Sequence, residues 1–197
     1  MFFQADSYPV DMDILPAFRS TSLTVACAPH AAREPVSQLA AALALRGPLT
    51  ILDGGNRFPP YRVAHLLRQK TVDVNAAAKR IFLQRAFTCY QMLALLENTP
   101  ALRQPYIILD LLATFYDDHV PAHEARRLLE LCLMQVERLS QSAPVLITLA
   151  PPITPERGFL VDTVCARASQ ILLPEIPAQA ETQLPLFTSS LSLSTCH

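Results

Sequence analysis

Lysine is nearly missing from this 197-residue chain: only two of its sixteen basic residues are lysines, Lys70 and Lys79. The formal net charge is −1, and the sequence contains no run of basic residues. A protein that binds nucleic acid strongly on its own normally shows a basic excess or a basic cluster. The sequence therefore predicts at most weak binding to single-stranded DNA, through arginines that folding brings together.

Long apolar runs and paired cysteines are missing too. Charged residues interrupt each apolar stretch before it reaches the ~20 residues that a membrane helix needs, and the N-terminal stretch lacks the basic region of a signal peptide. The five cysteines are scattered without a Cys-x-x-Cys pair, which favours buried free thiols over disulfides or a metal site. These absences predict a cytoplasmic protein with no membrane segment and no bound metal.

What the sequence does contain is a regular alternation of apolar, strand-like runs with helix-like stretches. This alternation predicts an α/β fold with a doubly wound, mostly parallel sheet and right-handed crossovers. We expect an irregular N-terminal segment at 1–20, one core domain at 21–175 and a disordered tail at 176–197. Strands are expected at 22–27, 49–52, 105–110, 144–149 and 170–173, and helices at 35–46, 60–67, 74–98, 122–141 and 159–168.

Five stretches follow one another in the chain: LTVACAP, TILDGGNRFPPYRVAHL, RAFTCYQMLALL, YIILDLLATFY and VLITLAPP. Taken in this order, they resemble the ATPase core of the RecA and RadA recombinase family over roughly residues 20 to 175. The resemblance implies a RecA-like P-loop NTPase fold, in which Asp110 matches the Walker B Asp that orients magnesium. A structural role for Asp110, accepting backbone N–H bonds at a strand end, is an open alternative. Phe82, Phe87 and Leu93 are expected to pack in the core.

The phosphate loop that this family uses is degenerate here. A working loop needs glycines whose N–H groups wrap the phosphates, a Lys that neutralises them and a hydroxyl for magnesium. In this sequence Arg33, Glu34 and Pro35 stand at the second Gly, the Lys and the hydroxyl, and a register that uses Ser37 puts Val36 at the Lys. His30 and Arg33 could meet an anion, although a solvated loop is the favoured interpretation. The degenerate region comprises Ala28, His30, Arg33, Glu34, Pro35 and Ser37.

The acidic turn after the second strand lacks the family's catalytic Glu. That Glu polarises the attacking water and falls two residues after Asp53, at the position of Gly55. Asn56 is not a base and Arg57 carries the wrong charge, so neither replaces it. The glycines are expected to serve a tight turn with positive φ, and Arg57 and Arg62 to lie on the solvated surface.

Ligands of a parallel α/β sheet bind beyond the carboxyl ends of the strands, and in the family a loop there binds DNA. Here the corresponding loop between 149 and 159 is stiffened by prolines and has no net positive charge. Arg157 and Arg167 are the candidates for a DNA contact, which we expect to be weak.

Two short segments are candidate docking handles. "FFQA" fits the Phe-x-x-Ala pattern by which recombinase subunits and their partners dock on a neighbouring core, with Phe2 and Ala5 as anchors. "LPLF" in the tail, with Leu184 and Phe187, is a second candidate.

Together these features predict a catalytically inactive RecA-like accessory protein, a pseudo-ATPase without a cofactor. It is expected to contact a RecA-family recombinase, or a repair polymerase or nuclease, in DNA recombination or repair. One alternative is a nucleotide-binding protein or switch with a non-standard phosphate loop, which would use ATP and magnesium. Another is a regulatory RecA-fold subunit outside DNA repair, such as a cell-division inhibitor.

Overall fold

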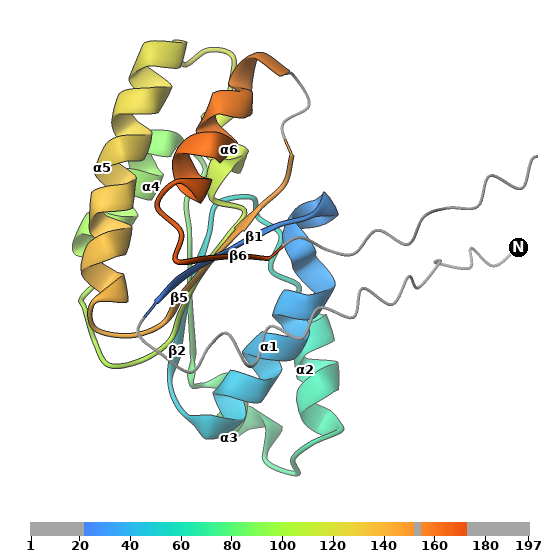
Figure 1. Cartoon of the computed structure of the whole chain (residues 1–197). Helices are drawn as coiled ribbons and strands as arrows, with labels where there is room; N and C mark the ends of the chain where they lie inside the picture. The colour runs from blue at the N-terminus through green and yellow to red at the C-terminus, as the bar shows by residue number, and fades with distance from the viewer. Residues whose placement is uncertain (1–21, 152–154, 173–197) are drawn as a thin grey trace, which may run out of the picture.

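The computed structural model describes residues 22–151 and 155–172, which form one sheet flanked by helices (Figure 1). The strands are β1 (Leu23–Cys27), β2 (Leu49–Asp53), β3 (Ile81–Arg85), β4 (Tyr106–Leu109), β5 (Val145–Leu149) and β6 (Gln170–Leu172). The α-helices are α1 (Arg33–Arg46), α2 (Pro60–Arg68), α3 (Val74–Ala78), α4 (Cys89–Asn98), α5 (Ala122–Ser140) and α6 (Gly158–Cys165). The short 3₁₀ helices are η2 (Pro29–Ala32), η3 (Leu111–Phe115) and η4 (Pro155–Arg157).

The six strands form one sheet in the order β3-β2-β4-β5-β1-β6, and every pair is parallel. Strands β2, β4 and β5 are buried along their whole length, which explains why their sequences are mostly apolar and do not alternate with polar residues. The predicted α/β class with a parallel sheet is therefore confirmed.

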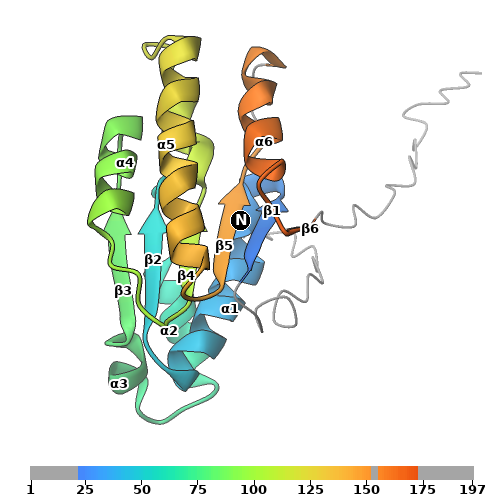
Figure 2. The same ribbon diagram turned by 60° about the vertical axis from the view of Figure 1, so that its left-hand side comes forward.

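Helices cover both faces of the sheet (Figure 2). Helices α1, α2 and α3 pack on one face, where Leu39, Leu67 and Ile107 belong to one buried cluster. Helices α4, α5 and α6 pack on the other, where Met92 and Leu129 belong to a second cluster. The two cores meet the alternate side chains of the same strands, because successive residues of a strand point to opposite faces.

The helix predicted over 74–98 is wrong, because it is three elements in the structure. Helix α3 ends at Ala78, β3 pairs with β2 at the edge of the sheet, and α4 begins at Cys89. The expected core packing of Phe82 and Phe87 is also wrong: these side chains are 55% and 68% exposed. Leu93 is partly buried against the core, as expected.

Two expectations from composition concern the cysteines and the membrane. Cys89 and Cys132 are buried free thiols, whereas Cys27 and Cys165 are free but only partly buried. In the part of the chain that the structure describes, no helix combines the length and the apolar character that crossing a membrane requires.

Candidate functional site

The carboxyl ends of β2 and β4 lie side by side and bring two carboxylates close to one turn. Asp53 ends β2 and is fully buried. Its Oδ1 accepts the Arg57 backbone N–H at 3.0 Å and its Oδ2 accepts that of Phe58 at 3.0 Å. The Arg85 guanidinium at the end of β3 lies 3.5 Å from Oδ2. Asp53 thus holds the turn that follows it.

Asp110 follows β4 and forms an ion pair with Arg57. The Arg57 Nε donates to Asp110 Oδ2, with the carboxylate 1% and the guanidinium side chain 39% exposed. Asp110 Oδ1 accepts the Ala150 backbone N–H at 3.3 Å, and the Asp110 backbone N–H donates to Thr148 Oγ1 at 3.0 Å. The expected solvated position of Arg57 is found only in part, because its side chain is 39% exposed while its guanidinium neutralises a buried charge. The structural alternative for Asp110 agrees with these bonds.

The two glycines of the turn serve close packing. A Cβ atom at Gly55 would lie 2.5 Å from Asp110 Oδ2, and one at Gly54 would lie 2.7 Å from the Met92 Cε. Neither glycine has positive φ, so the predicted glycine turn is wrong. The residue in the left-handed region is Asn56, with φ 51°, a conformation that Asn adopts more readily than most residues.

The residues interpreted from the sequence as a degenerate phosphate loop form the corner between β1 and α1. Three successive residues, His30, Ala31 and Ala32, have φ between 52° and 54°, a left-handed conformation that costs non-glycine residues roughly 1–2 kcal/mol each. Ala32 is the N-cap of α1 and provides no side-chain cap. The Ser37 hydroxyl donates to the Arg33 carbonyl at 2.7 Å, within the helix.

The other residues of this corner differ in burial. Ala28 and Pro35 are buried, whereas His30, Arg33 and Glu34 are exposed. The Arg62 Nε of α2 donates to Glu34 Oε1 at 3.0 Å. This hydrogen bond lowers the pKa of Glu34. Arg62 lies on the surface, as expected, with its side chain 45% exposed, and it forms an ion pair with Glu34.

The two candidate DNA-binding arginines have partners inside the domain. Arg157 is 8% exposed, and its guanidinium donates to the carbonyls of Phe115 and Val120 at 2.7 and 2.8 Å. Arg167 bridges two carboxylates of α5, Glu137 at 2.6 Å and Glu130 at 2.8 Å. The DNA contact remains a prediction, but these bonds do not favour it.

Sequence reasoning missed Arg85 as part of the site. The signal was present: Arg85 stands at the end of an apolar run and lies in register with Asp53 once β3 is paired with β2. The helix predicted over this stretch concealed it.

The docking candidates Phe2, Ala5, Leu184 and Phe187 lie outside the described residues. Within the described ranges, no group of three or more His, Cys, Asp or Glu side chains is placed to hold a metal ion.

Comparison with protein-family models finds no match for this chain, and comparison with curated proteins finds none either.

Proposed function

We propose that the chain is a RecA-like domain that does not hydrolyse ATP and that acts by docking on a partner protein in DNA recombination or repair. One observation carries the proposal: the Arg57 guanidinium is paired with the buried Asp110 carboxylate. Asp110 is the acidic residue that the resemblance assigns to magnesium. A cation of the protein itself already neutralises it.

The turn that contains Gly55 gives further support. The position of the catalytic Glu has no room for any side chain, because even a Cβ would meet Asp110. A carboxylate there would also face the charge of Asp110 across a few ångströms, where like charges repel. The position of the catalytic Glu therefore has no side chain, and a substitution there could not supply one without displacing Asp110.

The start of α1 supports the same conclusion. Glu34 stands where a phosphate-binding Lys is needed, and a carboxylate about 4 Å from a phosphate charge costs on the order of 4 kcal/mol at an effective dielectric near 20. Arg62 offsets part of this repulsion because it is paired with Glu34, but the same pairing leaves its guanidinium less available to a phosphate. Pro35 also removes an N–H donor from the first turn.

The test is a pull-down of the tagged full chain from its own cells, with and without ATP and magnesium. We expect recovery of a RecA-family recombinase, or of a repair polymerase or nuclease, at equal yield under both conditions. Asp110→Asn should leave the recovery unchanged, since on this account Asp110 touches no ligand. Phe2→Ala and Phe187→Ala distinguish the two candidate handles, because burying one Phe ring stabilises an interface by roughly 1.5–3 kcal/mol.

Recovery of metabolic enzymes only, or recovery that requires ATP, would contradict the proposal. If the wild type recovers the partner only in the presence of ATP, and Asp110→Asn recovers no partner even with ATP, the result would favour a nucleotide-dependent switch with a non-standard phosphate loop.

A further inference from the structure

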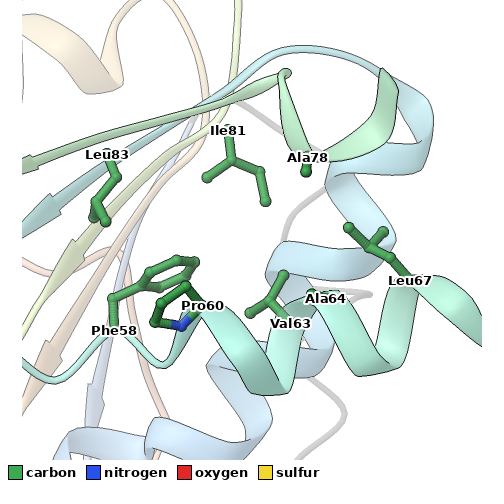
Figure 3. Close-up of a pocket in the computed structure, with 8 residues that line it drawn as sticks. All are labelled: Phe58, Pro60, Val63, Ala64, Leu67, Ala78, Ile81 and Leu83. Carbon is green, nitrogen blue, oxygen red and sulfur yellow. The ribbon is translucent and has the colours of Figure 1, made fainter. Parts of the chain in front are cut away.

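An apolar groove runs between β3 and the helices α2 and α3, and it is the starting point of the inference (Figure 3). It encloses about 200 Å³. Its floor includes the buried side chains of Phe58, Val63 and Leu67, and Ile81 and Leu83 of β3 form one wall. Every residue that lines it is apolar: Phe58, Pro60, Val63, Ala64, Leu67, Ala78, Ile81 and Leu83.

The wall of this groove is an edge strand with a free backbone. Among the described residues β3 pairs with β2 only. The Arg80 carbonyl accepts from Leu49 and the Ala86 N–H donates to Asp53, so the even-numbered residues of β3 face β2. The N–H and C=O groups of Ile81, Leu83 and Arg85 therefore point outward, where they can pair with an added strand.

A basic segment lies beside the groove, although the chain as a whole has a net charge of −1. Residues 68–80 contain four Lys and Arg residues, including both lysines of the chain, and one carboxylate, Asp73. Arg62 and Arg85, on either side of this segment, are paired with Glu34 and Asp53. Lys79 and Arg80 directly precede β3, and Lys70 follows α2. An acidic segment fits this surface electrostatically, whereas a basic one is repelled.

We propose that β3 and the adjoining groove bind an acidic, extended segment of a partner protein, which adds a seventh strand to the sheet. Apolar side chains at alternate positions of that segment fill the groove, and its carboxylates lie near the basic residues of 68–80. This inference rests on the proposed function in that it names the surface through which a partner docks.

The test is an NMR titration of the isotope-labelled full chain with blocked eight-residue peptides. The probe alternates Ile with Asp; one control replaces each Asp with Lys, and a second keeps the composition but places the four Ile residues together. We expect the probe to shift the amide signals of Ile81, Leu83 and Arg85, to bind at least tenfold more tightly than either control, and to weaken severalfold between 50 and 500 mM salt.

A matched pair of variants locates the site. Ala78→Glu places a carboxylate in the groove and should weaken binding of the probe at least tenfold. Ala94→Glu makes the same change at an exposed position of α4, on the other face of the sheet, and should leave binding unchanged. Unchanged amide spectra outside the substituted helix show that both variants fold.

Equal binding of the three peptides, or equal effects of the two variants, would overturn the proposal. The proposal would also be overturned if a segment of the same chain occupied the groove.

A candidate for such a segment is Val10-Asp11-Met12-Asp13-Ile14, which alternates apolar and acidic residues as the probe does. Tenfold tighter probe binding in an Asp11→Lys/Asp13→Lys variant would assign the groove to that segment. A concentration-dependent dimer that Ala78→Glu abolishes would assign it to a second copy. None of these outcomes depends on ATP or on a recombinase, so failure here leaves the pull-down prediction intact.

Discussion

At the scale of single residues, the ends of β2 and β4 form a closed set of polar contacts. Asp53 accepts two backbone N–H groups of its own turn, and Asp110 accepts one N–H and the Arg57 guanidinium. Buried carboxylates are stable only with such partners. Gly55 completes the set because its missing side chain lets the turn approach Asp110.

Gly55→Ala should therefore destabilise the protein. The added methyl group overlaps the Asp110 carboxylate, which cannot move without breaking its bond to Arg57, and overpacking of this kind costs typically 1–3 kcal/mol. Gly47→Ala is the matched control, because no atom lies within 4 Å of a Cβ at Gly47, and it should change the free energy of unfolding by less than about 1 kcal/mol. Urea denaturation measures both variants. Equal losses of unfolding free energy in the two variants would mean that contact with Asp110 does not exclude a side chain at position 55.

Cys132 gives a prediction about pH. Burial raises the pKa of its thiol to about 12, from an ordinary value of 9.0. Between pH 9 and 12 this thiol ionises in the unfolded state but not in the folded state. Its contribution to the free energy of unfolding is therefore fully present below pH 9 and is lost as the pH rises towards 12. From pH 7.5 to 10 the wild type should lose about 1.4 kcal/mol through this group.

The check is urea unfolding of the wild type and Cys132→Ala at both pH values. From pH 7.5 to 10 the wild type should lose about 1.4 kcal/mol more unfolding free energy than the variant, because the variant lacks the thiol. A difference that stays constant with pH would contradict the assignment.

At the scale of elements, the central strands could be predicted from the sequence and the edge strand could not. β2, β4 and β5 are buried on both faces, and their sequences are mostly apolar without alternation. β3 has partly buried and exposed residues only, and Phe82, Ala86 and Tyr90 recur at helical spacing just after the alanine-rich helix α3. The missed signal was Thr88 with Gln91 three residues later, a capping box in which Thr88 Oγ1 accepts the Gln91 N–H at 3.1 Å.

The contacts between the carboxyl ends of β2 and β4 could not be predicted from the sequence either. The resemblance drew attention to Asp53 and Asp110, but ion pairs between distant residues depend on strand order. Arg57 meets Asp110 because β4 lies beside β2, which no local pattern specifies.

The connection between η3 and η4 yields a prediction at this scale. Arg157 is buried and satisfies the carbonyls of Phe115 and Val120, so Arg157→Met should leave two buried acceptors without a donor and cost about 1–3 kcal/mol. Arg167→Met removes two exposed ion pairs with α5 and should cost less than about 1 kcal/mol. Urea denaturation compares the two. A larger loss for Arg167→Met would reverse the ranking of the two arginines.

At the scale of the whole molecule, charge is unevenly distributed. The net charge is −1, yet residues 68–80, at the end of α2 and through α3, carry four Lys and Arg residues and one carboxylate. At the carboxyl ends of β2, β3 and β4, in the region where α/β proteins bind their ligands, Asp53 and Asp110 are paired with Arg85 and Arg57. The docking surface that we propose lies elsewhere, beside the edge strand β3.

The most direct test of a domain without a working nucleotide site is a thermal melt of the full chain in millimolar ATP and magnesium. A ligand at 100 times its dissociation constant stabilises the native state by about 2.7 kcal/mol, which for a protein of this size raises Tm by roughly 5–11 °C. We predict no change in Tm. A rise of several degrees that disappears in Asp110→Asn would show that Asp110 is available to magnesium despite Arg57, and would contradict the account.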